Sequence, residues 1–277
     1  MHILITDSGV GGLSVVAYAE RFVRTRGFTE PVRLTFANAA PANDYGYNSM
    51  PSHAMKIETF DRFLRSVARR FAPDRIYVAC NTLSVLLPEV QAPVPIQGII
   101  ETGVARVVET LAPESIALIF GTQTTIDAGT YPRLLEALGV DAARIVSQAC
   151  PGLADVISED REGARAEAEI RRWVGEAMGK MPRRDAPIVA CLACTHYGYR
   201  KELFAAALGD AVVINPNESA VGDLFPRGGA IHDVDVDFVT RYALPPATVE
   251  TLTWLLGDIS PRTVAAMQSF VHVPDLF

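Results

Sequence analysis

Short apolar runs alternate with segments of helical spacing over most of this chain, and no other feature constrains the fold as strongly. The apolar runs lie at residues 3–6, 32–37, 76–79, 96–100, 116–120, 144–147, 188–191 and 212–214. The helical segments between them lie at residues 13–24, 53–71, 102–111, 125–138, 154–178 and 200–208. Parallel strands need crossover connections, which place helices on both faces of a sheet and make its strands apolar throughout. The sequence therefore predicts an α/β fold with doubly wound, mostly parallel sheets.

Two turns mark crossings between lobes, one in the Pro-containing stretch at residues 92–95 and one at residues 208–210. A chain of 277 residues has the length of about two domains. We therefore expect two similar lobes with the functional site in the cleft between them. The first lobe would comprise residues 1–94 and 209–277, and the second would comprise residues 95–208.

The stretch that follows Pro226 is less regular than the rest of the chain. Its pattern predicts a strand at residues 238–241 and a helix at residues 247–256. We expect residues 261–277 to form a tail.

Charge and hydropathy limit the classes of partner. The formal net charge of −7 and the pI of 5.3 argue against a nucleic-acid or anionic-membrane surface. No apolar run approaches the roughly 18 residues of a membrane helix, and the amino terminus lacks the basic leader and long apolar stretch of a signal peptide. We therefore expect a cytoplasmic protein that binds a small molecule. The oligomeric state stays open, and a homodimer is one of the states that the sequence allows.

Two of the cysteines stand at the ends of apolar runs. The cysteines are Cys80, Cys150, Cys191 and Cys194, too few for a disulfide scaffold in a chain of this length. Taken alone, Cys80 or Cys194 is most simply explained as a small buried residue. However, the carboxyl ends of parallel strands form the edge where ligands bind. Two thiols that face one pocket from different lobes can accept and donate a proton in turn, which inverts a carbon centre without a cofactor.

Polar groups follow each of these two cysteines. Asn81 and Thr82 come after the first, and Thr195 and His196 come after the second. Such donors, together with helix N-termini, can lower a thiol pKa below its free value of about 8.5. His196 is also placed to tune or reprotonate the second sulfur.

The first strand ends in a Gly-rich turn that admits two interpretations. Asp7 and Ser8 are typical helix-capping residues, but they also stand where they could assist Cys80 and bind a ligand. Residues 9–14 nearly match the dinucleotide fingerprint, which makes nucleotide binding an alternative. The third glycine is replaced by Ser14, and the next apolar run ends at Asn38 instead of the acid that binds ribose.

The spacing Cys191-x-x-Cys194-x-His196 raises metal or redox chemistry as a further alternative. No second ligand pair of comparable spacing is visible in the sequence, and we therefore prefer Cys191 as a buried strand residue and expect no metal and no cofactor. Tyr45 and Gly46 lie in a polar loop whose backbone amides could hold a carboxylate.

Several motifs resemble those of glutamate racemases, which belong to the aspartate/glutamate racemase family. The resemblance rests on Asp7-Ser8-Gly9-Val10-Gly11-Gly12-Leu13, on Ala79-Cys80-Asn81-Thr82-x-Ser84, and on Ala193-Cys194-Thr195-His196-Tyr197. Lesser markers follow in the family's order at Ile100-Glu101, Gly121-Thr122-x-x-Thr125-Ile126, Ala149-Cys150-Pro151 and Asn215-Pro216. The resemblance covers about residues 1–257.

This resemblance implies cofactor-independent racemisation of an acidic amino acid, with L- and D-glutamate as the expected substrates. Cys80 and Cys194 would be the paired acid and base, assisted by Asp7 and His196 respectively. The residues that would bind the amino acid are Ser8, Tyr45, Gly46, Asn81, Thr82 and Thr195. In the family, D-glutamate serves peptidoglycan synthesis.

The chain departs from the family pattern near the expected substrate side chain. Asn38 ends the second apolar run where the family usually has Asp, and Asp44 precedes Tyr45 where the family has Pro. Gly198 and Tyr199 replace the common Pro and Leu after the second motif. A racemase, isomerase or decarboxylase of another small dicarboxylate or amino acid, or a non-catalytic amino-acid sensor, therefore stays open as an alternative.

Overall fold

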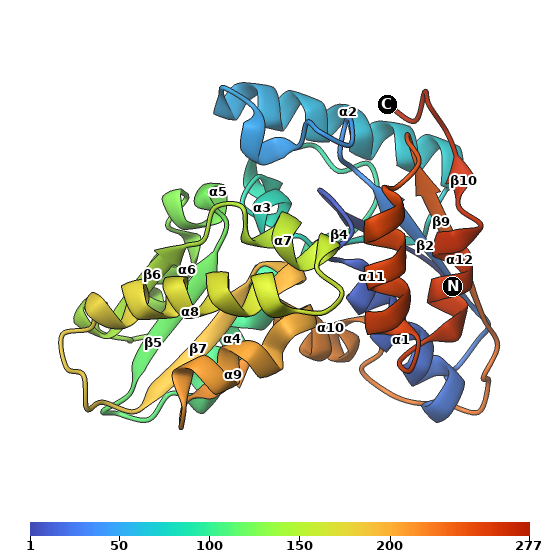
Figure 1. The fold of residues 1–277 in the computed structure, drawn as a ribbon. Helices are drawn as coiled ribbons and strands as arrows, with labels where there is room; N and C mark the ends of the chain where they lie inside the picture. The colour runs from blue at the N-terminus through green and yellow to red at the C-terminus, as the bar shows by residue number, and fades with distance from the viewer.

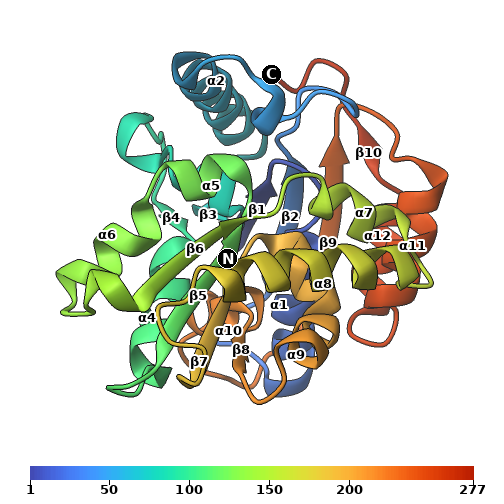
Figure 2. The same ribbon diagram turned by 60° about the vertical axis from the view of Figure 1, so that its left-hand side comes forward.

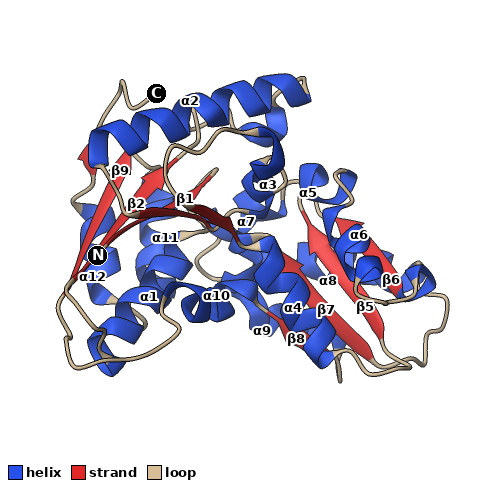
Figure 3. Cartoon of the chain, turned by 180° about the vertical axis from the view of Figure 1, so that it is seen from behind, coloured by secondary structure: helices blue, strands red, loops and turns tan.

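Two parallel sheets organise the chain, which the computed structural model describes over residues 1–277. The six-stranded sheet has the order β10-β9-β2-β1-β3-β4, and the four-stranded sheet has the order β6-β5-β7-β8. Figure 3 shows them side by side, the larger sheet on the left and the smaller on the right. The strands are β1 (His2–Asp7), β2 (Val32–Asn38), β3 (Arg75–Val78), β4 (Ile96–Gly98), β5 (Ile116–Gly121), β6 (Ile145–Ala149), β7 (Ile188–Ala193), β8 (Val212–Ile214), β9 (Val234–Thr240) and β10 (Val271–His272). The predicted α/β class with mostly parallel sheets is confirmed.

Helices cover both faces of each sheet (Figure 1). They are α1 (Leu13–Arg26), α2 (His53–Phe71), α3 (Asn81–Ser84), α4 (Ile100–Thr110), α5 (Gln123–Asp127), α6 (Thr130–Ala137), α7 (Leu153–Glu159), α8 (Ala164–Gly179), α9 (Lys201–Leu208), α10 (Pro216–Leu224), α11 (Pro246–Leu256) and α12 (Pro261–Gln268). On the six-stranded sheet, Ile3 and Ile5 of β1 face the core that contains α1, whereas Leu4 faces the core that contains α2. This alternation follows from the two-residue period of a strand.

The sequence of α2 explains why this segment forms a helix with one buried face. The buried residues Phe60, Phe63, Leu64 and Val67 recur at the i, i+3, i+4 and i+7 positions of one helical face. Ser52 caps the helix by accepting a hydrogen bond from the Met55 amide.

Two of the expected helices are each interrupted at a glycine. The segment predicted at residues 125–138 divides into α5 and α6 at Gly129, whose φ is +61°. The segment predicted at residues 154–178 divides into α7 and α8, and Gly163 there has a φ of +82°. A residue with left-handed backbone angles cannot continue an α-helix, so each helix is divided. The apolar residues keep their helical spacing on both sides of the break, which is why the sequence predicts one helix.

Sheet membership differs from the predicted lobe boundaries at both crossings. β4 pairs with β3 through Ile76 and Ile96, so it belongs to the larger sheet although residues 95–208 were assigned to the second lobe. β8 pairs with β7, so it belongs to the smaller sheet although residues 209–277 were assigned to the first lobe. Backbone hydrogen bonding decides membership, and each Pro- or Gly-containing turn precedes an edge strand that still pairs with the sheet before it.

The expectation of a tail at residues 261–277 is wrong. This stretch forms α12 and β10, and β10 pairs in parallel with β9. The end of the chain then packs on α2, where the Phe63 and Phe277 rings lie 5.2 Å apart at near right angles. The carboxyl-terminal segment is therefore part of the larger lobe (Figure 1).

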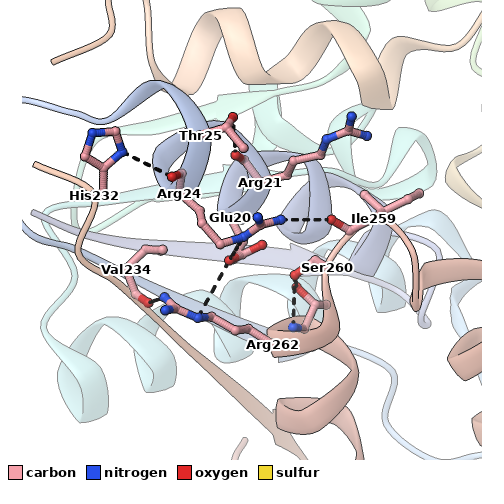
Figure 4. A network of polar contacts seen from close by, with 10 residues as sticks. Glu20, Arg21, Arg24, Thr25, His232, Val234, Ile259, Ser260 and Arg262 are labelled. Atoms are coloured by element: carbon pink, nitrogen blue, oxygen red, sulfur yellow. Dashed lines mark hydrogen bonds and ion pairs between the residues drawn. The ribbon is translucent and has the colours of Figure 1, made fainter. Parts of the chain in front are cut away.

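A buried carboxylate connects α12 to α1, as Figure 4 shows. Glu20 on α1 is fully buried, and its Oε1 lies 2.9 Å from Arg24 Nε and 3.9 Å from Arg262 Nε of α12. Arg262 also donates to the Val234 carbonyl at the start of β9. This network holds α1, β9 and α12 together.

None of the helices is both long and apolar enough to cross a membrane.

Candidate active site

Cys80 and Cys194 occupy equivalent positions in the two sheets. Cys80 follows β3 and precedes α3, and Cys194 follows β7 and precedes a 3₁₀ helix at Thr195–Arg200. Each sulfur therefore lies where a strand ends and a helical turn begins. Backbone N–H groups near each sulfur partly oppose the rise in thiol pKa that burial causes.

Both cysteines line a single cavity of about 520 Å³ that lies between the two sheets. Its lining includes nine of the ten sequence-predicted site residues, namely Asp7, Ser8, Gly46, Cys80, Asn81, Thr82, Cys194, Thr195 and His196. These residues come from the carboxyl ends of β1, β3 and β7 and from the loop after β2. The central strands of each sheet thus deliver them to one place, as expected for open α/β sheets.

Tyr45 is the exception, because it does not line the cavity although Asp44 and Gly46 on either side of it do. Its side chain is 37% exposed, and its hydroxyl donates to Met55 Sδ at 3.5 Å, outside the cavity lining. An isolated bridge between Ala42 and Tyr45 closes a tight turn in this loop. Tyr47 lines the cavity instead, buried against Phe60.

The glycines after β1 allow the two lobes to approach closely. A Cβ at Gly11 would lie 2.3 Å from Thr195 Oγ1 and 2.6 Å from His196 Nδ1. A Cβ at Gly12 would lie 2.9 Å from the Asp7 Cβ. The Gly-rich turn therefore serves contact with the second cysteine loop. Because Thr195 and His196 lie directly against the backbone at Gly11, a dinucleotide phosphate has no room there, which disfavours the nucleotide alternative.

Hydrogen bonds connect the auxiliary groups to the sulfurs. The Ser8 hydroxyl lies 3.1 Å from Cys80 Sγ, and His196 Nδ1 lies 4.0 Å from Cys194 Sγ. Asp7 Oδ2 accepts a 2.7 Å hydrogen bond from Thr195 Oγ1, so the carboxylate stands between the two cysteine loops.

Burial dominates the electrostatics of both thiols. It raises the pKa of Cys80 to about 12, with the Asp7 charge adding to this shift and the Ser8 hydroxyl opposing it. Burial also raises the pKa of Cys194 well above its usual value, and the charges of Asp7 and Cys80 raise it further. The polar residues after each cysteine led us to expect a lowered thiol pKa. In the structure the pKa of both thiols is raised, because desolvation outweighs the nearby donors.

His196 is shifted in the direction that favours its neutral form. Burial lowers its pKa, and the opposing charges of Asp7 and Asp155 do not reverse this shift. A neutral imidazole beside Cys194 is able to accept a hydrogen bond from the thiol.

Three threonine hydroxyls form a hydrogen-bonded chain between the lobes, and two of them, those of Thr82 and Thr122, belong to residues that line the cavity. Thr82 Oγ1 lies 2.9 Å from Thr122 Oγ1, which lies 3.0 Å from Thr125 Oγ1. In the sequence, Thr122 and Thr125 stand out only as family markers without a predicted role. Thr122 directly follows β5. Its place at a strand end could have identified it as a site residue, because the other site residues also lie at strand ends.

Further lining residues come from two segments that hold none of the ten predicted site residues. Helix α7 contributes Asp155, Ser158 and Glu159, and the chain from residue 242 into the first turn of α11 contributes Tyr242, Leu244, Pro245 and Thr248. Helices α7 and α11 pack together beside the cavity (Figure 2), where Arg161 and Glu250 form a 2.7 Å ion pair. No local pattern marks residues 242–248 as site residues. They lie at the cavity because the chain returns to the larger lobe at β9.

Cys191 and Cys194 face opposite sides of their sheet. Cys191 belongs to the core that contains α4 and α6, whereas Cys194 belongs with the core on the other face. This placement agrees with Cys191 as a buried strand residue and separates the two sulfurs that a metal or redox Cys-x-x-Cys would need together. No group of three or more His, Cys, Asp or Glu side chains is arranged to hold a metal ion.

Comparison with known proteins places this architecture in a family. The family described as Asp/Glu/Hydantoin racemase matches residues 19–224. A glutamate racemase from Desulforudis audaxviator is 31% identical over 232 residues, which cover 80% of this chain and 78% of that protein. A glutamate racemase from Aquifex pyrophilus is 31% identical over 223 residues, covering 79% and 80% respectively.

A solved structure shares the whole fold. The glutamate racemase from Francisella tularensis in complex with D-glutamate superposes with a TM-score of 0.74 at 20% identity, over 99% of this chain and 98% of that one. The family match and the sequence relatives together establish the resemblance seen in the motifs: this chain belongs to the Asp/Glu/Hydantoin racemase family.

Proposed function

We propose that this chain interconverts L- and D-glutamate without a cofactor, with Cys80 and Cys194 as the paired acid and base. One observation carries the proposal: two thiols from separate sheets line the same cavity. The relatives named as glutamate racemases support glutamate as the substrate. D-glutamate formed in this way would serve peptidoglycan synthesis.

The reaction needs one thiolate and one thiol on opposite sides of the substrate α-carbon. The thiolate removes the α-proton from one side, and the electron pair of the broken C–H bond delocalises into the α-carboxylate. The other thiol then donates its proton to the opposite side of the same carbon. At the end the first sulfur carries the proton and the second is the thiolate, so the reverse reaction uses the same groups in exchanged roles.

The groups beside each sulfur assist these transfers. Ser8 lies within hydrogen-bonding distance of Cys80, and backbone N–H groups partly offset the burial that raises the pKa of both thiols. His196 is neutral because burial lowers its pKa, and its Nδ1 lies 4.0 Å from Cys194 Sγ, where it can accept a hydrogen bond from the thiol. Asp7 is oriented by Thr195 and is close enough for its charge to raise the pKa of both thiols. Its charge would favour the return of a proton to either sulfur.

The cavity lining fits an amino acid that is held by neutral donors. No Lys or Arg lines the cavity, so hydroxyl, amide and backbone N–H groups would bind the substrate carboxylates. Thr82 and Thr122 supply hydroxyls to the cavity lining, and Asn81 supplies an amide. Fixed donors of this kind stabilise developing negative charge in a cavity with little water.

Exchange of the α-hydrogen in deuterated water tests the two-thiol mechanism. Proton NMR of L- and D-glutamate should show loss of the α-hydrogen signal with the parent enzyme. Cys80→Ala and Cys194→Ala should each abolish racemisation, while Cys150→Ala, which removes a buried cysteine outside the cavity, should retain it. Racemisation at near the parent rate by Cys80→Ala would refute the mechanism.

A panel of L- and D-amino acids tests the substrate. Glutamate should give the highest kcat/KM, measured by polarimetry or deuterium exchange. A higher kcat/KM for another amino acid, or release of carbon dioxide from a dicarboxylate, would overturn the assignment to glutamate.

A further inference from the structure

A tyrosine outside the cavity holds a side chain that lines it. Tyr131 on α6 donates a 2.8 Å hydrogen bond to Asn81 Oδ1 on α3. Both side chains are buried, but only Asn81 belongs to the cavity lining. The bond also crosses from the four-stranded lobe to the six-stranded lobe, so the position of α6 sets the orientation of a group at the site.

The amide of Asn81 is only half satisfied. Its Oδ1 accepts from Tyr131, whereas its Nδ2 is buried with no hydrogen-bond partner. Buried polar groups are nearly always paired, and an unpaired donor in a cavity wall indicates a ligand group that completes it. An N–H donor suits a carboxylate oxygen.

A second neighbour of Tyr131, Cys191, bears on which group accepts the Tyr131 proton. Cys191 lies beside Tyr131 in the same core, where each group affects the pKa of the other. Burial raises the pKa of Cys191 to about 12 and raises that of Tyr131 well above its usual value, so both groups keep their protons at neutral pH. A protonated thiol is a weak acceptor, and the amide carbonyl is a strong one. The Tyr131 proton therefore goes to Asn81 Oδ1, and the Cys191 S–H is left to donate to the Tyr131 oxygen.

The position of Tyr131 is itself fixed by packing. A Cβ at Gly103 of α4 would lie 2.3 Å from the Tyr131 hydroxyl oxygen. The ring is thus enclosed between α4 and β7, and the hydroxyl cannot turn away from Asn81 without moving one of them.

We propose that Tyr131 is a positioning residue: by donating to Asn81 Oδ1 it turns Asn81 Nδ2 toward a substrate carboxylate. Cys191 supports it by donating to the Tyr131 oxygen. This inference rests on the proposed function, since it assigns one contact of the proposed substrate. It also gives a role to Cys191, which does not line the cavity.

The first test is Tyr131→Phe, which removes the hydroxyl and keeps the ring. With L-glutamate and D-glutamate, KM should rise about tenfold while kcat stays within about twofold, because a contact present in both the ground state and the transition state contributes to binding. Tyr77→Phe is the matched control, since Tyr77 is a neighbouring buried tyrosine whose hydroxyl lies near Thr102 and Asp223, away from the cavity. It should leave KM unchanged.

A double-mutant cycle separates positioning from general loosening of the fold. Asn81→Ala should raise KM by itself, and adding Tyr131→Phe to it should have no further effect, because Tyr131 would act only through Asn81. If the two effects multiply instead, or if Tyr131→Phe has the parent KM, the proposal is refuted.

Two further variants test the direction of the hydrogen bonds. Asn81→Asp places a second oxygen where Nδ2 was and should raise KM more than Asn81→Ala does, by repelling the carboxylate. Tolerance of Asn81→Asp would show that Asn81 presents its carbonyl to the substrate and would overturn the proposal. Cys191→Ala keeps the Tyr131 ring and should raise KM about threefold, whereas Cys191→Ser, which keeps a donor, should restore it. Equal KM values for these two variants would remove Cys191 from the proposal.

The two-thiol mechanism and the positioning role of Tyr131 are tested by different variants. If Cys80→Ala retained racemisation, the acid–base assignment would fail, whereas the Tyr131 and Asn81 cycle would still report on substrate binding. If the cycle failed while Cys80→Ala was inactive, only the positioning role would be lost.

Discussion

Thr195 donates a 2.7 Å hydrogen bond to Asp7, and this bond connects the two halves of the cavity. Thr195 directly follows the second cysteine, and Asp7 ends the central strand of the larger sheet. Both side chains are buried. The Asn217 amide holds the same loop from behind by donating to the Thr195 carbonyl and to Ser14 at the start of α1. Residues of the site therefore fix the relative position of the lobes that carry it.

Replacing Thr195 by Val should impair both activity and stability. Asp7 would lose its donor while staying buried, which should lower the free energy of unfolding by about 1–3 kcal/mol. Racemisation should fall at least about tenfold, since a misplaced carboxylate and cysteine loop alter the geometry of proton transfer. Urea denaturation and α-hydrogen exchange measure the two effects. Thr195→Ser, which keeps the hydroxyl, should restore most of both; parent activity in Thr195→Val would show that the bond is dispensable.

The buried thiol of Cys150 should make stability depend on pH in the alkaline range. Burial raises its pKa to about 12 in the folded protein, whereas a free thiol has a pKa of about 8.5. The folded chain therefore holds this proton between the two values while the unfolded chain releases it. The resulting stabilisation is complete below the unfolded pKa and declines as pH rises, by about 1.4 kcal/mol per pH unit.

Cys150→Ala removes this contribution. The loss of unfolding free energy that the variant shows at pH 7.5 should shrink as pH rises from 8.5 to 10, measured by urea denaturation under reducing conditions. Cys150 is suited to this measurement because it lies outside the cavity lining. A difference between parent and variant that stays constant over this range would contradict a raised thiol pKa.

The ion pair of Glu20 should be more sensitive to loss of the arginine than to loss of the carboxylate charge (Figure 4). The Glu20 side chain is 0% exposed, whereas Arg24 and Arg262 are 39% and 53% exposed. Arg24→Ala leaves a buried carboxylate with Arg262 Nε at 3.9 Å as its nearest charge, and should lower the free energy of unfolding by about 3 kcal/mol. Glu20→Gln removes the buried charge, and both arginines can turn to water.

The double variant Glu20→Gln with Arg24→Ala should accordingly be more stable than Arg24→Ala alone. Chemical denaturation of the four proteins completes the cycle. If the double variant were the least stable, the cost would lie in lost packing and not in the unpaired buried charge.

The local pattern of the chain was enough to place the main chemical groups. Asp7, Cys80 and Cys194 each follow an apolar run, and parallel pairing brings strand ends to one edge of a sheet. The position of a residue relative to its own strand is a short-range property that the two-residue period and the following turn express directly. The α/β class follows from the same signal.

The orientation of the loop after β2 could not be found in this way. Tyr45 and Tyr47 are two residues apart, and the pattern does not tell which ring is buried. Tyr47 packs against Phe60 of α2, which is distant in the sequence, and is buried, whereas Tyr45 is exposed. Similarly, the local pattern does not show that α12 packs against β9 and α1, where Val264, Ala266 and Met267 enter the core.

The sequence by itself determined the alternation of strands and helices, the residues at the strand ends, and hence the family to which the chain belongs. Only the tertiary structure decided that Asp7 binds Thr195, that Tyr131 orients Asn81, and that residues 242–248 form a wall of the cavity. Local periodicity records which face of an element is buried. It does not record which distant element covers that face, because that choice depends on the shape and hydrogen bonding of surfaces that meet only when the lobes have packed.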